Sequence, residues 1–173
     1  MSIREAIISD LKILTGGKAS IKDFFEWYFF PRGEMFRFMV WYRVLLYYRW
    51  KYGKLGSIIP YYILRHYEFK YGIHFNPGIP VGKGLHIVHG DGVHLNCKSI
   101  GNNVTIYQGV TLGTGKGGLP VIGNNVTIYP NAVISGGISI GDGATIGANA
   151  FVNKDVNPGD TVAGIPGKSI RRK

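Results

Sequence analysis

The sequence has little cysteine: Cys97 is the single one among 173 residues. One cysteine excludes an internal disulfide, and the absence of disulfides is typical of proteins from a reducing compartment. We interpret Cys97 as a small turn or core residue, because turn-forming residues surround it and no activating partner stands beside it. The sequence therefore predicts a cytoplasmic protein.

Long apolar runs are missing as well. Four charged residues fall within the first twelve positions, where a signal peptide would need an apolar segment. The longest uncharged stretch of the N-terminal part, residues 55–64, has ten residues and contains Pro60. A membrane-spanning helix needs about 18 or more apolar residues. We expect neither a signal peptide nor a transmembrane span.

Acidic residues are scarce. Ten Asp and Glu stand against twenty Lys and Arg, which gives a formal net charge of +10. This excess predicts an anionic partner, such as an acidic membrane surface, a phosphorylated ligand or an anionic glycan. Nucleic acid is disfavoured, because the basic residues are scattered and no known nucleic-acid-binding module is visible.

Aromatic residues almost disappear after Gly72. Of the 23 aromatic residues 19 lie in residues 1–72, whereas 20 of the 26 glycines follow Phe75. This break predicts a helical N-terminal region over residues 1–72 and a different domain over residues 73–173. In the first region we expect helices over residues 3–14, 35–52 and 60–70, ending at Gly16-Gly17, at Gly53 and before Gly72.

The aromatic and basic side chains of these helices have two interpretations. They pack against the next domain or a partner subunit, or they rest on a membrane interface, where aromatic rings and basic residues are both stable. The two interpretations are compatible, so a peripheral contact with the inner face of an anionic membrane stays open.

The second region repeats every six residues. Aliphatic side chains recur at nine successive positions, with one longer step: Ile100, Ile106, Leu112, Ile122, Ile128, Ile134, Ile140, Ile146 and Val152. An earlier set (Ile73, Ile79 and Leu85) keeps the same step in another register. Hexapeptide periodicity is typical of a parallel β-helix, in which three hexads form one triangular coil and the aliphatic residue points inward. Glycine and Asn tolerate the positive φ of its tight corners, which explains the abundance of glycine.

A loop interrupts the repeat. The step from Leu112 to Ile122 is ten residues, so four extra residues must leave the coil within residues 113–121, GTGKGGLPV. Loops that leave a regular solenoid often carry its function. Glycine allows a ligand close to the backbone, and Lys116 supplies a cation for a phosphate. The spacing of a P-loop is absent.

The runs NNVTIYQGVTLGTGKGG, GANAFVNKDV and AGIPGKSIRRK resemble the hexapeptide acyltransferases of the serine acetyltransferase family. The resemblance covers about residues 72–173. Within that family HGDGVHLN is most similar to the HGxGxxxN segment of sugar O-acetyltransferases from capsule and exopolysaccharide clusters. The resemblance implies a left-handed parallel β-helix that forms a homotrimer, with acetyl-CoA bound between subunits and no metal.

The family pattern also assigns residues. It implies His89 as the catalytic base and places CoA contacts at Gly113, Thr114 and Lys116 in the loop and at Pro130 and Ala148 in successive coils. Lys168 and residues 171–173 would lie near the nucleotide phosphates. Asp91 and His74 are candidates to orient His89, although Asp91 also suits a plain turn. His74, His94 and Asn96 are candidates for acceptor binding, and Asn96 equally suits a turn cap.

Three departures from the family pattern concern the acceptor. His74 and Val88 stand where serine acetyltransferases have Asp, and the loop lacks their Arg-His pair. A site without charged partners gains little from a charged ligand. We therefore expect a hydroxyl of a sugar or polysaccharide precursor as the acceptor, with serine as the alternative.

The segment HIVHGDGVH, residues 86–94, holds three of the five histidines. Acetyl transfer from a thioester to a hydroxyl needs a base, a role that His commonly takes. We expect His89 to act as the base while the acetyl group passes directly to the acceptor without an acyl-enzyme, since no nucleophile elbow is present. A zinc enzyme like the γ-class carbonic anhydrases is one alternative, but the third histidine of a three-ligand site is not in place. A non-catalytic β-helix that only binds ligands is another.

Overall fold

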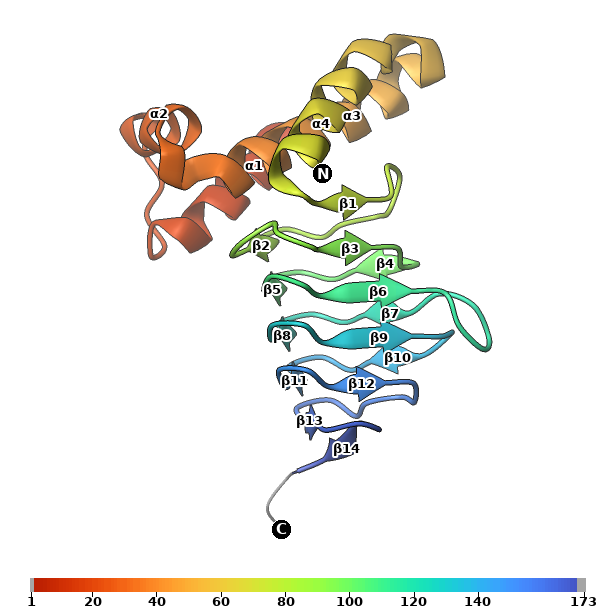
Figure 1. The fold of residues 1–173 in the computed structure, drawn as a ribbon. Helices are drawn as coiled ribbons and strands as arrows, with labels where there is room; N and C mark the ends of the chain where they lie inside the picture. The colour runs from red at the N-terminus through yellow and green to blue at the C-terminus, as the bar shows by residue number, and fades with distance from the viewer. Residues whose placement is uncertain (1, 171–173) are drawn as a thin grey trace.

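A computed structural model describes residues 2–170, apart from the side chain of Arg32. Helices come first, and a column of short strands follows (Figure 1). The helices are α1 (Ile3–Leu14), α2 (Ile21–Phe29), the short 3-10 helix η1 (Pro31–Gly33), α3 (Glu34–Gly56) and α4 (Ile58–Tyr71). No helix within residues 2–170 is long and apolar enough to cross a bilayer.

The three expected helices are confirmed, and α2 is an additional one. α2 begins at a capping box: Asp23 N–H donates to Ser20 Oγ, and Ser20 N–H donates to Asp23 Oδ2. The expected stop at Gly53 is a kink, because this glycine has φ 69° inside α3 and the helix then continues to Gly56. α4 ends where Gly72 adopts φ 63°.

Fourteen strands of two or three residues, joined by turns and loops, follow the helices in the described chain. They are β1 (His74–Phe75), β2 (His86–Ile87), β3 (His94–Leu95), β4 (Ser99–Ile100), β5 (Thr105–Ile106), β6 (Thr111–Gly113), β7 (Val121–Ile122), β8 (Thr127–Ile128), β9 (Val133–Ser135), β10 (Ser139–Ile140), β11 (Thr145–Ile146), β12 (Phe151–Val152), β13 (Thr161–Ala163) and β14 (Lys168–Ser169).

The strands form three sheets that run along the column. The first sheet is β1-β3-β6-β9-β12, the second is β4-β7-β10, and the third is β2-β5-β8-β11-β13-β14. All the pairings are parallel except that of β13 with β14. Thr127 pairs with Thr145, eighteen positions later, so one coil holds three hexads. The predicted parallel β-helix is confirmed.

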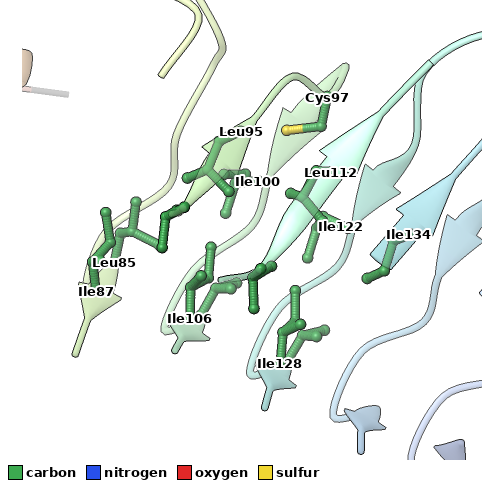
Figure 2. Close-up of a cluster of buried hydrophobic side chains, with 14 of the residues drawn as sticks. Leu85, Ile87, Leu95, Cys97, Ile100, Ile106, Leu112, Ile122, Ile128 and Ile134 are labelled. Atoms are coloured by element: carbon green, nitrogen blue, oxygen red, sulfur yellow. The ribbon is translucent and has the colours of Figure 1, made fainter. Parts of the chain in front are cut away.

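The repeated aliphatic residues point into the column. Ile106, Ile128 and Ile146 are fully buried and lie on adjacent strands of the third sheet. Figure 2 shows Ile100, Leu112, Ile122 and their neighbours gathered between the sheets. Burial of one such side chain contributes about 1.5–3 kcal/mol relative to exposure. Because each coil is only one residue layer thick, the coils are stable only as a stack.

The expected division into domains at residues 72 and 73 stays a prediction. The chain leaves α4 at Tyr71 and enters β1 at His74. Side chains of α3 reach the first coil, where the Tyr42 hydroxyl donates to the Ile79 carbonyl oxygen over 2.8 Å. The buried Glu68 of α4 accepts a hydrogen bond from Phe75 N–H. These contacts fix the helices on the end of the column that carries residues 86–94.

Candidate active site

His89 lies where the helices meet the first coil. Its pocket is lined by helical residues and by one corner of the coil: Leu14, Trp27, Pro31, Glu34, Met35, Phe36, Lys70, Tyr71 and residues 86–91. The imidazole of His89 is exposed, and no hydrogen bond or ion pair joins it to another side chain within residues 2–170. The ring is therefore open to a ligand, and no side chain of residues 2–170 orients it through a hydrogen bond or an ion pair.

Gly90 sets the wall of this pocket. A Cβ at this position would lie 2.8 Å from Sδ of Met35 and 3.1 Å from the carbonyl oxygen of Tyr71. A side chain at this position would make Met35 and the backbone of Tyr71 shift, so glycine allows the close packing of the helices against the corner.

His86 shares the pocket with His89. Its pKa is lowered from 6.5, mainly because burial disfavours the charged ring and also because His89 lies near it. His86 belongs to strand β2. The structure makes His86 a second imidazole of the pocket, one that stays neutral more readily than an exposed histidine.

This lowered pKa predicts a pH dependence of stability. As pH falls below 6.5, His86 of the unfolded chain binds a proton before His86 of the folded chain does, so the free energy of unfolding decreases. Above 6.5 the two states are equally neutral and the effect vanishes. Urea unfolding at pH 5.5 and 7.5 measures the loss, and His86→Asn should reduce it. An equal loss in His86→Asn would contradict the assignment.

The candidate acceptor residues lie elsewhere. His74 and His94 are paired across β1 and β3, with ring centroids 4.6 Å apart, and Asn76 Nδ2 donates to Asn96 Oδ1 over 3.1 Å. These residues line a second depression, on the first sheet beside Arg65, and are not among the residues that line the His89 pocket. The structure thus does not bring His74, His94 or Asn96 to His89 within this chain. Their role in acceptor binding stays a prediction.

Asp91 lies beside His89 in the pocket but makes no hydrogen bond to it in the described chain. Its carbonyl oxygen accepts from Gly109 N–H over 2.9 Å, which stacks its corner on the next coil. The same corner continues through Pro130, whose carbonyl accepts from Asn149 N–H. We call the stacked residues 88–93, 107–110, 129–132 and 147–150 the His89 corner.

The predicted CoA contacts fall on two corners. Pro130 and Ala148 belong to the His89 corner, whereas Gly113, Thr114 and Lys116 lie at the other edge of the first sheet, where the loop leaves β6 (Figure 1). Hydrogen bonds from Ser135, Gly136 and Gly137 hold the base of the loop, while Thr114 to Gly117 stay exposed. A single chain therefore does not bring the loop and the His89 corner together. Lys168 lies in β14 at the far end, and residues 171–173 fall outside the described residues.

Two residues that line the pocket have no signal in the sequence motifs. Glu34 and Lys70 come from the helices and line the pocket with His89. Only the long-range contacts of the fold could have pointed to them.

Gln108, which lies within the run NNVTIYQGVTLGTGKGG, belongs to the His89 corner. Its Oε1 is buried and accepts no hydrogen bond from any described group. A buried oxygen without a donor costs about 1–3 kcal/mol.

Cys97 is buried and does not line the pocket of His89. Burial raises the pKa of the Cys97 thiol to about 12, so the nucleophilic thiolate is scarce at neutral pH. Within residues 2–170, no group of three or more His, Cys, Asp or Glu side chains is arranged to hold a metal ion.

Comparison with known proteins adds a family. The model of the family described as "Bacterial transferase hexapeptide (six repeats)" matches residues 120–154. Serine acetyltransferase of Bacillus subtilis (strain 168) is 44% identical over 109 residues, which are 60% of this chain and 50% of that protein. The crystal structure of Neisseria gonorrhoeae serine acetyltransferase in complex with serine is 31% identical, with a TM-score of 0.72, over 96% of this chain and 68% of that one.

The chain belongs to the serine acetyltransferase family. A serine acetyltransferase from Brucella abortus strain S19, solved in complex with coenzyme A, matches 96% of this chain and 67% of that one at 25% identity and a TM-score of 0.79. The match spans about half the length of the Bacillus subtilis protein.

The expected sugar acceptor is wrong. The relatives at 44–47% identity and the structural neighbours are serine acetyltransferases, which favours the alternative acceptor, serine. The expectation rested on His74, Val88 and the loop. It compared positions of the β-helix alone and left out the helical residues that line the pocket of His89.

Proposed function

We propose that this chain is an acetyl-CoA-dependent serine O-acetyltransferase with His89 as its base. One observation carries the proposal: the pocket of His89 also holds a carboxylate, Glu34, and an amine, Lys70. Serine is a zwitterion, so Glu34 matches its ammonium group and Lys70 matches its carboxylate. The family supports serine and CoA as ligands, because structures of its members have been solved with serine and with CoA.

The chemistry follows from the exposed imidazole. Neutral His89 takes the proton of the serine hydroxyl while the oxygen attacks the thioester carbonyl. The tetrahedral intermediate then collapses, the carbon–sulfur bond breaks, and the CoA thiolate leaves with the proton that the imidazolium returns. The products are O-acetylserine and free CoA. His86, held neutral by burial, adds no positive charge beside His89.

Acetyl-CoA fits the loop and the corner as parts of one groove. The loop offers exposed glycine backbone and the amine of Lys116, and the corner offers the stacked Pro130 and Ala148. Since one chain keeps these two parts at different edges of the first sheet, we propose a homotrimer in which the loop of one subunit faces the His89 corner of the next. Gly113, Thr114, Lys116 and Lys168 then bind CoA, and Asp91 helps to orient His89. A cytoplasmic location belongs to the same proposal.

Substrate analogues test the acceptor. Thiol release from acetyl-CoA is measured with L-serine, with ethanolamine, which lacks the carboxylate, and with 3-hydroxypropionate, which lacks the ammonium group. We expect kcat/KM to be about tenfold or more higher for serine than for either analogue, because each lost analogue group removes one charge-assisted contact. If folded protein released no thiol with serine, the proposal would fail.

Two variants test how serine is held. Glu34→Gln and Lys70→Gln should each raise KM for serine about tenfold and leave KM for acetyl-CoA unchanged, because each removes one of two charges in the pocket. Lys12→Gln is the matched control, since Lys12 is exposed on α1 and does not line the pocket. Equal KM values for serine in all three variants would show that Glu34 and Lys70 do not bind serine. This result would not contradict the role of His89 as the base.

A further inference from the structure

The connection between α3 and α4 projects away from the column, at the end opposite to the C-terminal strands (Figure 1). We call residues 47–62 the α3–α4 tip. The last fully buried side chain of α3 before the tip is Leu45. Beyond it the large apolar side chains face solvent: Trp50 and Leu55 are each 82% exposed, Ile59 is 72% and Tyr62 is 68% exposed. Such a cluster is far more apolar than a solvated surface needs to be.

Basic side chains surround these apolar ones. Arg49, Lys51 and Lys54 are exposed on the tip. Lys51 Nζ lies 5.1 Å from the ring centroid of Tyr52 and 5.6 Å from that of Tyr47. No Asp or Glu occurs from residue 35 to residue 67. The tip therefore combines insertable aromatic and aliphatic groups with uncompensated positive charge.

We infer that the α3–α4 tip docks on an anionic membrane surface. Trp, Tyr and aliphatic side chains enter the boundary between headgroups and acyl chains, while Lys and Arg stay at the level of the anionic headgroups. Neither helix is suited to cross the bilayer, so the contact is peripheral. The inference does not depend on the acceptor or on the chemistry of the pocket.

A second copy of this chain suits the tip less well. Two tips in contact would bring Arg49, Lys51 and Lys54 of each copy together, and no carboxylate of residues 35–67 would compensate them. Anionic lipid removes this repulsion, because its charge is opposite. In the proposed trimer, a threefold rotation places the three tips in one plane, where one bilayer can bind all of them and gain from multivalency.

Vesicle co-sedimentation of the full chain tests the inference. The probes are vesicles of phosphatidylcholine alone and of phosphatidylcholine with phosphatidylserine, each at low and at raised salt. We expect binding to the anionic vesicles that weakens with salt. Lys51→Gln/Lys54→Gln should lower the partition coefficient roughly 30-fold, since each basic residue near an anionic surface contributes about 1 kcal/mol. Trp50→Ser/Leu55→Ser should lower it at every salt concentration.

The control removes the same charge elsewhere. Lys98→Gln/Lys154→Gln changes two exposed lysines on the β-helix and should leave binding close to that of the unchanged chain. Two results would overturn the inference: no binding of the unchanged chain to anionic vesicles, or an equal loss of binding in the control. If the unchanged chain does not bind vesicles, size-exclusion chromatography of the tip variants without lipid is compared with that of the unchanged chain, and a smaller oligomer is the second sign against the inference. A smaller oligomer in the tip variants would show that the tip is a contact between copies of this chain.

Discussion

His89→Ala is expected to lower kcat for acetyl transfer by about 10²–10⁴-fold, the usual contribution of a general base. The side chain is exposed and makes no hydrogen bond to another described side chain, so its removal should leave stability within about 0.5 kcal/mol of the unchanged chain. The loss should therefore appear in turnover and not in the amount of folded protein. Thiol release at saturating serine and acetyl-CoA measures it.

His66→Ala is the matched control for this variant. His66 is exposed on α4, contacts the ring of Tyr67 and does not line the pocket, so its removal should leave turnover unchanged. Circular dichroism and size-exclusion chromatography establish that both variants keep the fold and the assembly. Near-full turnover in His89→Ala would remove His89 as the base and turn attention to His86, the other imidazole of the pocket.

The β-helix was predictable because its repeat is local. Each hexad carries its own inward aliphatic residue, such as Ile128 or Ile146, and the next coil needs nothing but the same pattern. Residue spacing also predicted the loop, since four extra residues have no room in a coil. α2 was missed although Ser20 and Asp23 form a capping box, a signal that the sequence does contain.

The pocket was not predictable in the same way. Glu34 and Lys70 lie far from His89 in the sequence, and they line the same pocket because α3 and α4 pack on the corner. Such contacts depend on how the N-terminal helices are joined to the β-helix, and no local sequence pattern predicts this arrangement. Motif positions on the β-helix describe one wall of the pocket, and helical residues line the others.

A buried ion pair, Asp10 of α1 with Arg43 of α3, stands at the junction of the helices and the β-helix. Each side chain is at most 3% exposed. The Asp10 carboxylate accepts from Arg43 Nε and Nη2, each over 3.0 Å, and from the N–H groups of Gly84 and Leu85 over 3.0 and 3.1 Å. Arg43 also donates to the carbonyl oxygens of Val81 and Gly82. The pair thus joins two helices and the first coil, and every polar atom of the carboxylate is used.

Asp10→Ala is therefore expected to lower the free energy of unfolding by about 3–5 kcal/mol, because it leaves the Arg43 guanidinium buried without a counter-charge and two N–H groups without acceptors. Urea unfolding followed by circular dichroism measures the loss.

Glu5→Ala is the control: it removes the exposed pair Glu5–Lys83, whose charged atoms are 3.7 Å apart, and should cost less than about 1 kcal/mol. A loss in Asp10→Ala no larger than that of the control would show that this ion pair does not stabilise the junction. Asp10→Leu/Arg43→Met separates charge from shape: if the unpaired charge causes the loss, this double variant should be more stable than Asp10→Ala.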